Sequence, residues 1–579
     1  MPTLRGPILK FGVLFFITSH ALFALSVNRV NGGGNVNYID FSLPGSTIPL
    51  ELVRSYNSIT ALTEQSGWSG AFGWGWTSPI ETTLITTPER YVILRDGGTG
   101  NTVIFKPQKE DPKVRAAFFE KVKRAYFEGK SGRKMKDTEI AKLKLPDKIM
   151  VRLKTEVAFR NEMASRYGIS GIIPKGELLT SSEYGYQTLA FKNNQWIREH
   201  DGMIQTFDKD GRLVRHQDKS GATFNFKYPV GKGQVEEMAD NDKLNTLKFT
   251  WRQDRIIEVI DNRGHKSQYT YDALGNLASA TDSNRQTYSY QYDNKKFPHL
   301  LTRIDYQTES AGGKKVYREI KYDANGLVVF HREKDGAETT YQYGRSSQDP
   351  ENNFWTRVIR KDKNGTEDET DSFVIKARAD GSKYLYKQSA KRGKSEVTTV
   401  YTSCCGKPAQ VTENGKVTNY KYNEFGQLLE KISSKEYLKL EYDPRWKKVV
   451  KVNQNGFVSN YQYDNRGNLV KAVNTRNEKV TLKYDRSGRI TEMTDPDGKS
   501  ITFKYGIQSK PTVISERGTG TIRIAYDTDG RVTKTETLLE RRQNRKPSDA
   551  ESAEVIRRVM KSFQGLLNII RPAGVSLAG

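Results

Sequence analysis

Short segments that alternate between polar and apolar residues run through the second half of the chain, as in Tyr461-Gln462-Tyr463. A spacing of two places both tyrosine rings on the same face of a β-strand. Turn residues bound each segment: Asn455-Gly456 ends seven residues before Tyr463, and Gly467 lies four residues after it. Asn-Gly and Asp-Gly supply the positive φ of tight hairpin turns, so each unit is predicted to be two short antiparallel strands.

This unit recurs from Phe207 to Tyr526, mostly in steps of 20 to 22 residues. A fixed period of this length predicts a stacked array. The step before Tyr322 is longer and predicts an extra loop over 298–313, and the stretch from Tyr343 to Tyr401 is irregular. The positions that define the repeat are Tyr271, Gly275, Tyr322, Gly326, Tyr422, Gly426, Tyr463, Gly467, Tyr484, Gly488, Tyr526 and Gly530.

Roughly 30 strands spaced about 4.8 Å apart would form a flat sheet some 140 Å wide. Twisted open sheets rarely exceed about ten strands, so this sheet must curl. We therefore expect a mainly β protein whose antiparallel sheet forms a spiral or barrel-like wall, a partial or complete shell. Stacked unit on unit, the tyrosine rings are expected to form aromatic ladders that hold the sheet together, a structural and not a catalytic role.

The region before the array, residues 31–106, is also predicted to be rich in β-strands. Its last part, residues 90–106, has the pattern of a hairpin with a turn at Asp96-Gly97-Gly98. The cluster Gly73-Trp74-Gly75-Trp76 allows two interpretations. The tryptophans could stack on a sugar ring or fill a core, and we expect them to fill a core.

Residues 108–180 differ in residue pattern from the segments on either side and are predicted to form a helical insertion. Between Gln108 and Leu179 there are 18 Lys or Arg and 10 Asp or Glu, so the insertion is basic. Asp111-Pro112 marks a helix start, a second helix begins near Asp137, and a third is predicted from about Asp147 to Tyr167.

The C-terminal tail is predicted to contain an amphipathic helix. Ser548 and Glu551 form a capping box, and apolar residues follow at helical spacing from Val555 to Ile570. The apolar stripe must be buried. We expect it to dock back onto the sheet, and a partner or a membrane surface are the alternatives.

The N-terminus has the pattern of a secretory signal peptide over residues 1–26. Arg5 and Lys10 precede an apolar run, and Ala24 and Ser26 fit cleavage before Val27. The alternative is an uncleaved anchor, although the run is short for a membrane span. No later segment is apolar for long enough to cross a bilayer. We therefore expect the mature protein in the periplasm, on the outer surface or outside the cell.

The formal net charge of +25 indicates either anionic partners or a basic surface that is simply solvated. Because of the export signal, the expected partners are anionic envelope polymers or extracellular nucleic acid, and no specific nucleic acid is expected. The two cysteines, Cys404 and Cys405, are neighbours, and a vicinal disulfide between them would be strained; burial as small apolar residues is the other interpretation. Catalytic, cofactor-binding and metal-binding residues are not indicated, because the recurring aspartates occupy equivalent turn positions and the six histidines are scattered.

The Tyr-Asp-x-x-Gly pattern, with a turn glycine seven residues before it, resembles the YD repeat of the Rhs family, which includes teneurins and the C components of insecticidal toxin complexes. Residues Arg54, Tyr56, Asn57, Gly73, Trp74, Gly75 and Trp76 lie in motifs that resemble the domain preceding the repeats in bacterial Rhs proteins. With this resemblance the chain divides into a signal peptide (1–26), an Rhs-type N-terminal β domain (27–107), the basic helical insertion (108–180), a YD-repeat array (181–537) and a tail with an amphipathic helix (538–579).

The resemblance implies a β-strand shell around a hollow, which in many relatives encloses a C-terminal toxin. Relatives with a toxin carry an aspartate-containing cleavage signature after the repeats. Asp495-Pro496-Asp497-Gly498 does not match that signature, because it lies inside a repeat turn.

These observations predict an exported, non-enzymatic structural or interaction scaffold, or a shell for a separately encoded polypeptide. The alternative is a carbohydrate-binding or adhesion protein for anionic envelope polysaccharide. No cofactor is expected.

Overall fold

The computed structural model describes residues 25–570, except 45–47, 63–68, 182–185, 201, 219–221, 232, 242–243, 308–315, 379–382, 404–405, 446, 487, 507–509, 527–531 and 540–546. Residues 1–24 of the signal peptide predicted over 1–26 lie outside the described residues. So do Cys404, Cys405 and Gly530. The loop predicted over 298–313 is described only up to Gln307.

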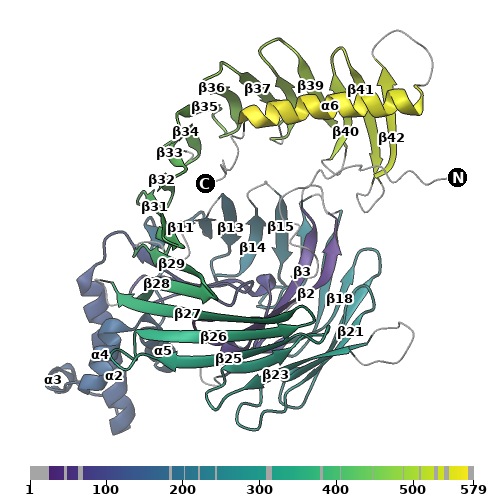
Figure 1. The fold of residues 1–579 in the computed structure, drawn as a ribbon. Helices are drawn as coiled ribbons and strands as arrows, with labels where there is room; N and C mark the ends of the chain where they lie inside the picture. The colour runs from purple at the N-terminus through teal and green to yellow at the C-terminus, as the bar shows by residue number, and fades with distance from the viewer. Residues whose placement is uncertain are drawn as a thin grey trace.

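The N-terminal strands form a small sheet. Its order is β1 (Ser26–Val27), β2 (Gly34–Leu43), β3 (Leu50–Asn57) and β6 (Trp76–Thr77). A short ribbon of β4 (Ser69–Gly70) and β5 (Gly73–Trp74), the helix α1 (Ser58–Ala61) and the 3-10 helix η1 (Pro79–Glu81) accompany it. We call β1–β6 and α1 the plug, because β2 and β3 lie inside the curve of the larger sheet (Figure 1).

Within the described residues, the larger sheet comprises 36 antiparallel strands paired in chain order from β7 to β42. The first of these are β7 (Thr83–Thr86), β8 (Val92–Arg95), β9 (Thr102–Pro107), β10 (Leu178–Ser181), β11 (Gln187–Lys192), β12 (Gln195–His200), β13 (Met203–Phe207), β14 (Leu213–Gln217), β15 (Thr223–Lys227), β16 (Glu237–Asp240), β17 (Thr246–Arg252), β18 (Arg255–Asp261), β19 (Lys266–Tyr271), β20 (Leu277–Thr281), β21 (Thr287–Gln291), β22 (Arg303–Gln307), β23 (Val316–Tyr322), β24 (Val328–Arg332) and β25 (Glu338–Arg345).

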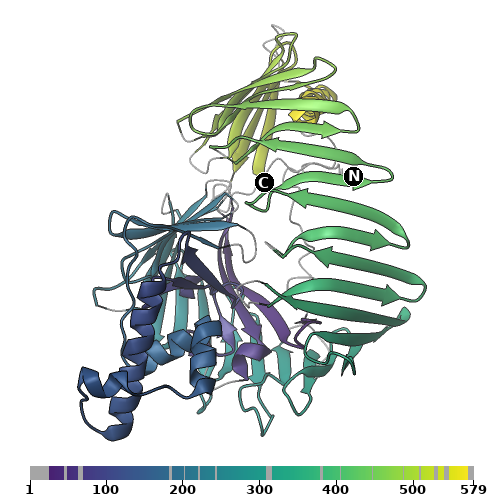
Figure 2. The same cartoon turned by 90° about the vertical axis from the view of Figure 1, so that its left-hand side faces the viewer.

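The sheet continues through β26 (Asn353–Asp362), β27 (Gly365–Ala377), β28 (Lys383–Arg392), β29 (Ser395–Tyr401), β30 (Pro408–Glu413), β31 (Lys416–Tyr422), β32 (Leu428–Ser433), β33 (Tyr437–Tyr442), β34 (Val449–Gln454), β35 (Phe457–Tyr463), β36 (Leu469–Asn474), β37 (Lys479–Tyr484), β38 (Ile490–Thr494), β39 (Ser500–Tyr505), β40 (Pro511–Glu516), β41 (Gly520–Tyr526) and β42 (Val532–Leu539). Figure 2 shows that this sheet curls. The mainly β, curled antiparallel architecture predicted from the repeat is confirmed.

The first part of the large sheet closes on itself. Thr83 in β7 forms an antiparallel bridge with Arg212, just before β14, and the Leu84 amide donates to the Gly211 carbonyl over 2.9 Å. Gly211 has a φ of +86°, and a Cβ there would lie 2.1 Å from the Leu84 carbonyl oxygen. Only glycine permits this approach. Strands β7–β9, which precede the predicted array, therefore belong to the same sheet as the repeats.

Many of the repeats contain a β-bulge directly before the repeat tyrosine. The pairing register shifts between Lys483 and Tyr484, for example, and in the same way before Tyr271, Tyr322, Tyr422, Tyr463 and Tyr526. A bulge adds local twist, so a bulge that recurs from repeat to repeat bends the sheet at many points. The curl expected from strand number thus has a local cause.

The turns of the repeat have the predicted backbone. Asn455 and Gly456 have φ values of +53° and +88°, as a tight hairpin with two left-handed residues requires. Four residues after the tyrosine, the glycines are also left-handed, with φ of 78° at Gly275, 80° at Gly326, 71° at Gly426, 80° at Gly467 and 79° at Gly488. Asp464 caps its turn by accepting from the Arg466 and Asn468 amides, each over 2.8 Å.

The helical insertion lies between β9 and β10 and consists of α2 (Pro112–Ser131), α3 (Asp137–Ala141), α4 (Asp147–Thr155) and α5 (Val157–Arg166). The Asp111 side chain caps α2 by accepting from the Lys113 amide. The single helix predicted from Asp147 to Tyr167 is wrong: it is broken at Glu156, whose φ of −112° and ψ of 108° are extended. The break lets Leu153 and Phe159 turn into one small core with Phe118 and Val122.

The C-terminal helix α6 (Asp549–Ile570) docks back onto the sheet, as expected. Val555 and Val559 pack against Ile522, and Leu566 packs in the cluster that contains Tyr461 and Met493. The predicted capping box forms, because the Ser548 amide donates to Glu551 over 2.8 Å. Figure 1 shows α6 running across the last strands of the sheet.

Candidate functional site

The repeat tyrosines act through their hydroxyl groups. Tyr484 donates its hydroxyl to the carbonyl of Leu469 over 2.8 Å, and Leu469 begins the strand of the preceding unit. The same bond joins Tyr271 to Ile256 (2.6 Å), Tyr322 to Leu301 (2.8 Å), Tyr343 to Val328 (2.6 Å), Tyr442 to Leu428 (2.8 Å), Tyr463 to Val449 (2.7 Å), Tyr505 to Ile490 (2.6 Å) and Tyr526 to Pro511 (2.9 Å). We call this bond the tyrosine latch.

The latch replaces the ring-on-ring ladder that the spacing suggested. Among the described residues, the aromatic contacts do not join one repeat tyrosine to the next. Burial raises the pKa of Tyr484 and Tyr442 to about 12, so both hydroxyls keep the proton that they donate. Tyr422 lies after its bulge opposite Leu428, in the equivalent position.

The N-terminal motif residues meet at the contact between the plug and the larger sheet, which we call the wall. Arg54 is fully buried and pairs with Asp40, to which its Nη2 donates over 2.9 Å. Its guanidinium also lies 4.9 Å from the ring of Trp76 and donates to the Tyr290 hydroxyl over 3.2 Å. Asp40 accepts in turn from the Tyr269 hydroxyl over 2.7 Å. This cation therefore joins the plug to strands more than two hundred residues away.

Tyr56 and Asn57 have different structural roles. Tyr56 donates its hydroxyl to the His299 carbonyl over 3.0 Å and accepts from the Leu301 amide over 2.9 Å. Asn57 caps α1 through the Ile59 amide. Both side chains are occupied by contacts within the protein.

The glycine and tryptophan cluster binds the turn that follows Tyr271. Trp74 donates its indole N–H to the Leu274 carbonyl over 3.1 Å, and its ring stacks on His299 at 4.4 Å. Gly73 has a φ of +96°, and a Cβ there would lie 2.8 Å from the Gly275 carbonyl oxygen. Trp76 is fully buried. These contacts assign the cluster to packing and leave no free sugar platform at Trp76.

The plug and α6 cover equivalent faces of the repeats at the two ends of the sheet. Two residues before their latch tyrosines, Tyr269 and Tyr341 are buried in the cluster that contains the plug residue Phe41. Tyr461, in the same repeat position, is buried in the cluster that contains Leu566 of α6. We call this the inner face.

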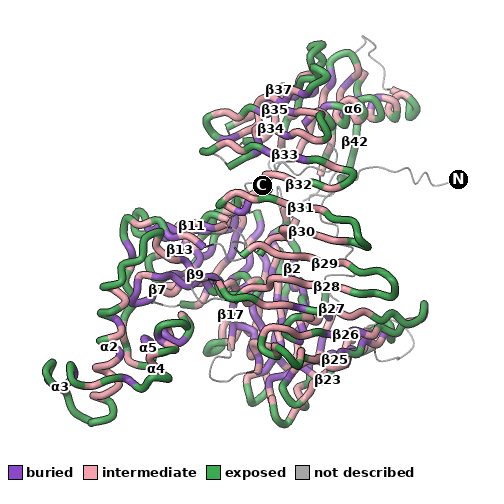
Figure 3. The backbone as a smooth tube through the Cα atoms, turned by 60° about the vertical axis from the view of Figure 1, so that its left-hand side comes forward, coloured by how far each residue is buried: buried purple, intermediate pink, exposed green. Residues whose placement is uncertain are grey.

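Between these two covered parts lies a stretch of the sheet without buried residues in its described strands. No described residue of β28, β29, β30, β31 or β32 is buried, whereas buried residues occur in β27 and again in β33 (Figure 3). We call residues 383–433 the open span.

The inner face of the open span can be followed across the strand pairs. Gln388 lies opposite the buried Phe373 and opposite Thr399, and Thr399 lies opposite Val411. Directly opposed residues share a face, so Gln388, Thr399 and Val411 continue the inner face. Gln388 donates to Asp371 over 3.1 Å and accepts from the Tyr401 hydroxyl over 3.1 Å. The result is a mixed surface of hydroxyl, amide, valine and tyrosine groups.

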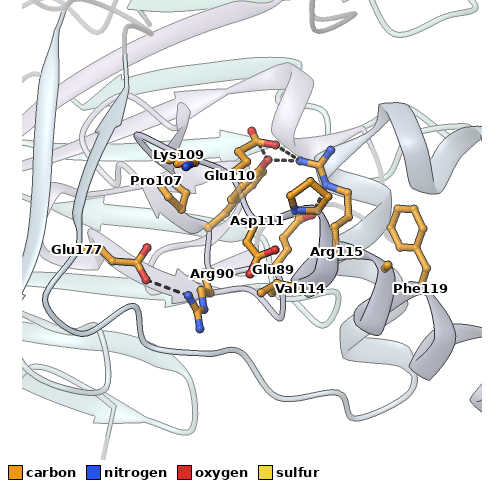
Figure 4. A pocket seen from close by; sticks show the side chains of 13 residues that line it. Glu89, Arg90, Pro107, Lys109, Glu110, Asp111, Val114, Arg115, Phe119 and Glu177 are labelled. Carbon is orange, nitrogen blue, oxygen red and sulfur yellow. Dashed lines mark hydrogen bonds and ion pairs between the residues drawn. The ribbon is translucent and has the colours of Figure 1, made fainter.

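A pocket of about 240 Å³ lies where the helical insertion meets β8 (Figure 4). The buried Glu89 accepts from Arg160 over 2.7 Å and lies 3.4 Å from Arg115. Tyr91 donates to Glu110 over 2.6 Å, and burial raises the pKa of Tyr91. Arg90 pairs with Glu177 over 3.0 Å. These charges neutralise one another and fix the insertion to the sheet, which is a structural arrangement.

Among the residues that the structure describes, no group of three or more His, Cys, Asp or Glu residues could hold a metal ion. No described helix is both long and apolar enough to cross a membrane.

Three family models match the sequence. The teneurin YD-shell matches residues 368–542, the RHS repeat matches 251–287, and a domain of unknown function, DUF6531, matches 26–105. No curated protein matches the chain.

Similar solved structures include a crystal structure of TcdB2-TccC3, at 10% identity and a TM-score of 0.35, covering 88% of this chain and 30% of the other. The Tc holotoxin pore of Photorhabdus luminescens has 10% identity and a TM-score of 0.35, covering 88% and 29%. A porin-like protein from Bacteroides uniformis has 13% identity and a TM-score of 0.17, covering 42% and 90%. The chain thus spans less than a third of the Tc chains. The three family matches confirm the resemblance to Rhs and YD-repeat proteins that the tyrosine and glycine spacing indicates.

Proposed function

We propose that the chain is an exported, non-enzymatic scaffold or shell at the cell envelope or outside the cell, whose open span contacts a second polypeptide. The interruption of burial between β27 and β33 carries this proposal. Elsewhere the inner face is covered, first by the plug and then by α6. Tyrosine and valine among neutral polar groups are typical of surfaces that bind proteins, where tyrosine is enriched and charge is depleted.

The absence of activity is part of the proposal. The titratable groups that combine strong burial with close charged neighbours, such as Arg54 with Asp40, join the plug to the wall. The buried Glu89 joins the insertion to the sheet in the same way. Each of these groups is paired with an opposite charge from the protein itself, which supports a structural role.

A site-specific photo-crosslinker tests the proposal. Placed at Thr399, it faces inward from the open span; placed at Thr398, the neighbouring residue, it faces outward beside Ser389. The full chain carrying either probe would be expressed in its native host, irradiated and purified. We expect one polypeptide cross-linked at Thr399 and not at Thr398. Equal cross-linking at both positions, or none at Thr399, would refute the proposal. Anionic polysaccharide that co-purifies in place of a polypeptide would support the adhesion alternative.

A further inference from the structure

The end of the helical insertion farthest from the sheet is strongly basic. Residues 130–148, which we call the basic tip, run from the end of α2 through α3 to the start of α4. They contain seven Lys or Arg and three Asp or Glu. Figures 1 and 2 show α3 at the outer end of the insertion, projecting away from the curled sheet.

The acidic residues of the basic tip do little to offset its lysines. Glu139 pairs with Arg133 over 2.6 Å, and Asp137 pairs with Arg124 of α2. In the described part of the chain, the ion pairs of these acids are made with arginine and leave the tip lysines exposed to solvent. The exposed lysines are Lys130, Lys134, Lys136, Lys142, Lys144 and Lys148.

An exposed aliphatic side chain lies beside these charges. Val151 of α4 is 58% exposed. It lies three residues after Lys148 and three before the exposed Lys154, so the three side chains share one face of the helix. A face that combines lysines with an aliphatic residue suits the boundary between lipid headgroups and acyl chains.

The shape of the tip favours a flat partner. A polymer chain is bound in a groove by the planar guanidinium groups of arginine or by aromatic rings that stack on it. This tip is instead a projecting end whose charges are ammonium groups on flexible lysine side chains. Such point charges are attracted to the diffuse negative potential of an anionic bilayer. We propose that the basic tip binds the surface of a membrane containing anionic phospholipids and so holds the curled sheet against it.

The test is sedimentation of the full chain with vesicles. Vesicles of phosphatidylcholine alone are compared with vesicles containing about one-third phosphatidylglycerol, at low and at physiological salt. Each lysine near an anionic surface contributes about a fivefold change in binding. Replacing Lys134, Lys136, Lys142 and Lys144 with Gln is therefore expected to weaken binding to the anionic vesicles at least tenfold.

A matched variant controls for total charge. Lys334, Lys363, Lys479 and Lys499 are exposed lysines at hairpin ends of the array, outside the open span and far along the chain from the tip. Their replacement with Gln removes the same charge and is expected to leave most of the binding intact. The proposal is overturned if both variants lose binding to the anionic vesicles equally, or if the tip variant keeps that binding. It is also overturned if the unaltered chain binds neutral vesicles as well as anionic ones, or binds neither kind. Retention on heparin that depends on the tip, without vesicle binding, would assign the tip to a polysaccharide and overturn it too.

Discussion

Arg54 and Asp40 form a buried two-point ion pair at the contact between the plug and the wall. The pair is not isolated, because the guanidinium reaches Tyr290 and the carboxylate reaches Tyr269. Removing one partner of a buried pair leaves the other charge without compensation, and this typically costs about 3–5 kcal/mol.

Arg54→Met is therefore expected to lower the free energy of unfolding by roughly 3–5 kcal/mol. The urea midpoint, followed by tryptophan fluorescence, measures it. Arg357→Met breaks the exposed Arg357–Asp368 pair and serves as the control, for which we expect little change. Adding Asp40→Asn to Arg54→Met should recover part of the loss. An Arg54→Met midpoint equal to the control would show that the pair does not hold the plug.

Removing one tyrosine latch is expected to lower stability slightly and only in the neighbouring strands. Tyr484→Phe keeps the ring and removes the bond to the Leu469 carbonyl, which should cost about 1 kcal/mol. Amide hydrogen exchange should become faster in β36 and β37. Tyr437 is exposed and makes no such bond in the described structure, so Tyr437→Phe is the matched control. Equal exchange in the two variants would exclude a role for the hydroxyl.

The buried Glu81 is expected to make the stability of the folded protein depend on pH. Burial raises its pKa from 4.5 to about 7, and its carboxylate accepts from the Ala71 amide. Because the folded-state pKa is the higher one, the folded protein favours the protonated form. This stabilisation is complete below pH 4.5 and is lost as the pH rises to about 7, a change of about 3 kcal/mol.

Glu81→Gln cannot titrate, so its stability relative to the unaltered chain should rise by about 3 kcal/mol between pH 4.5 and pH 8. Comparing the two pH values cancels any fixed cost of the amide. Urea midpoints of both proteins at each pH provide the measurement. A constant difference between the two proteins would mean that Glu81 titrates normally.

The contacts of Leu25 disfavour the predicted cleavage before Val27. Its backbone nitrogen donates to Glu333 Oε1 over 3.0 Å, its side chain is buried, and Ser26–Val27 pairs with β2. Cleavage before Val27 would remove Leu25 and Ser26 from these contacts. Cleavage after Ala24 would instead place a charged α-amino group against Glu333, which strengthens the hydrogen bond.

We therefore expect the exported protein to begin at Leu25, as N-terminal sequencing would reveal. Glu333→Gln should leave the cleavage point unchanged and lower the melting temperature of the processed protein. A sequence that begins at Val27 would contradict the prediction, whereas a chain that is not exported at all would count against the proposed function.

The repeat could be predicted from the sequence because its causes are local. The positive φ of Gly456 and Gly467 follows from turn chemistry within a few residues. The capping box of Ser548 and Glu551 and the start of α2 at Pro112 are local in the same sense. The predicted third helix was wrong because tertiary packing of Phe159 outweighed a continuous helical pattern at Glu156.

The candidate site depended on contacts that no local pattern contains. The spacing of the tyrosines indicated a shared face, but the acceptor of each hydroxyl is fixed by how the strands are placed in the sheet, as for Tyr484 and Leu469. The open span could not be found from composition, because its alternating strands resemble their neighbours. Only the positions of the plug and of α6 distinguish it.

The sequence alone determined a two-strand repeat with two left-handed turns, because glycine and asparagine adopt those dihedral angles at tight turns with little steric cost. The tertiary structure alone decided that Arg54 is buried against Tyr290, 236 residues away, and that the plug and α6 cover the two ends of the inner face. Burial depends on what packs against a surface from distant parts of the chain, and identical local patterns can therefore end in a core or in an open face.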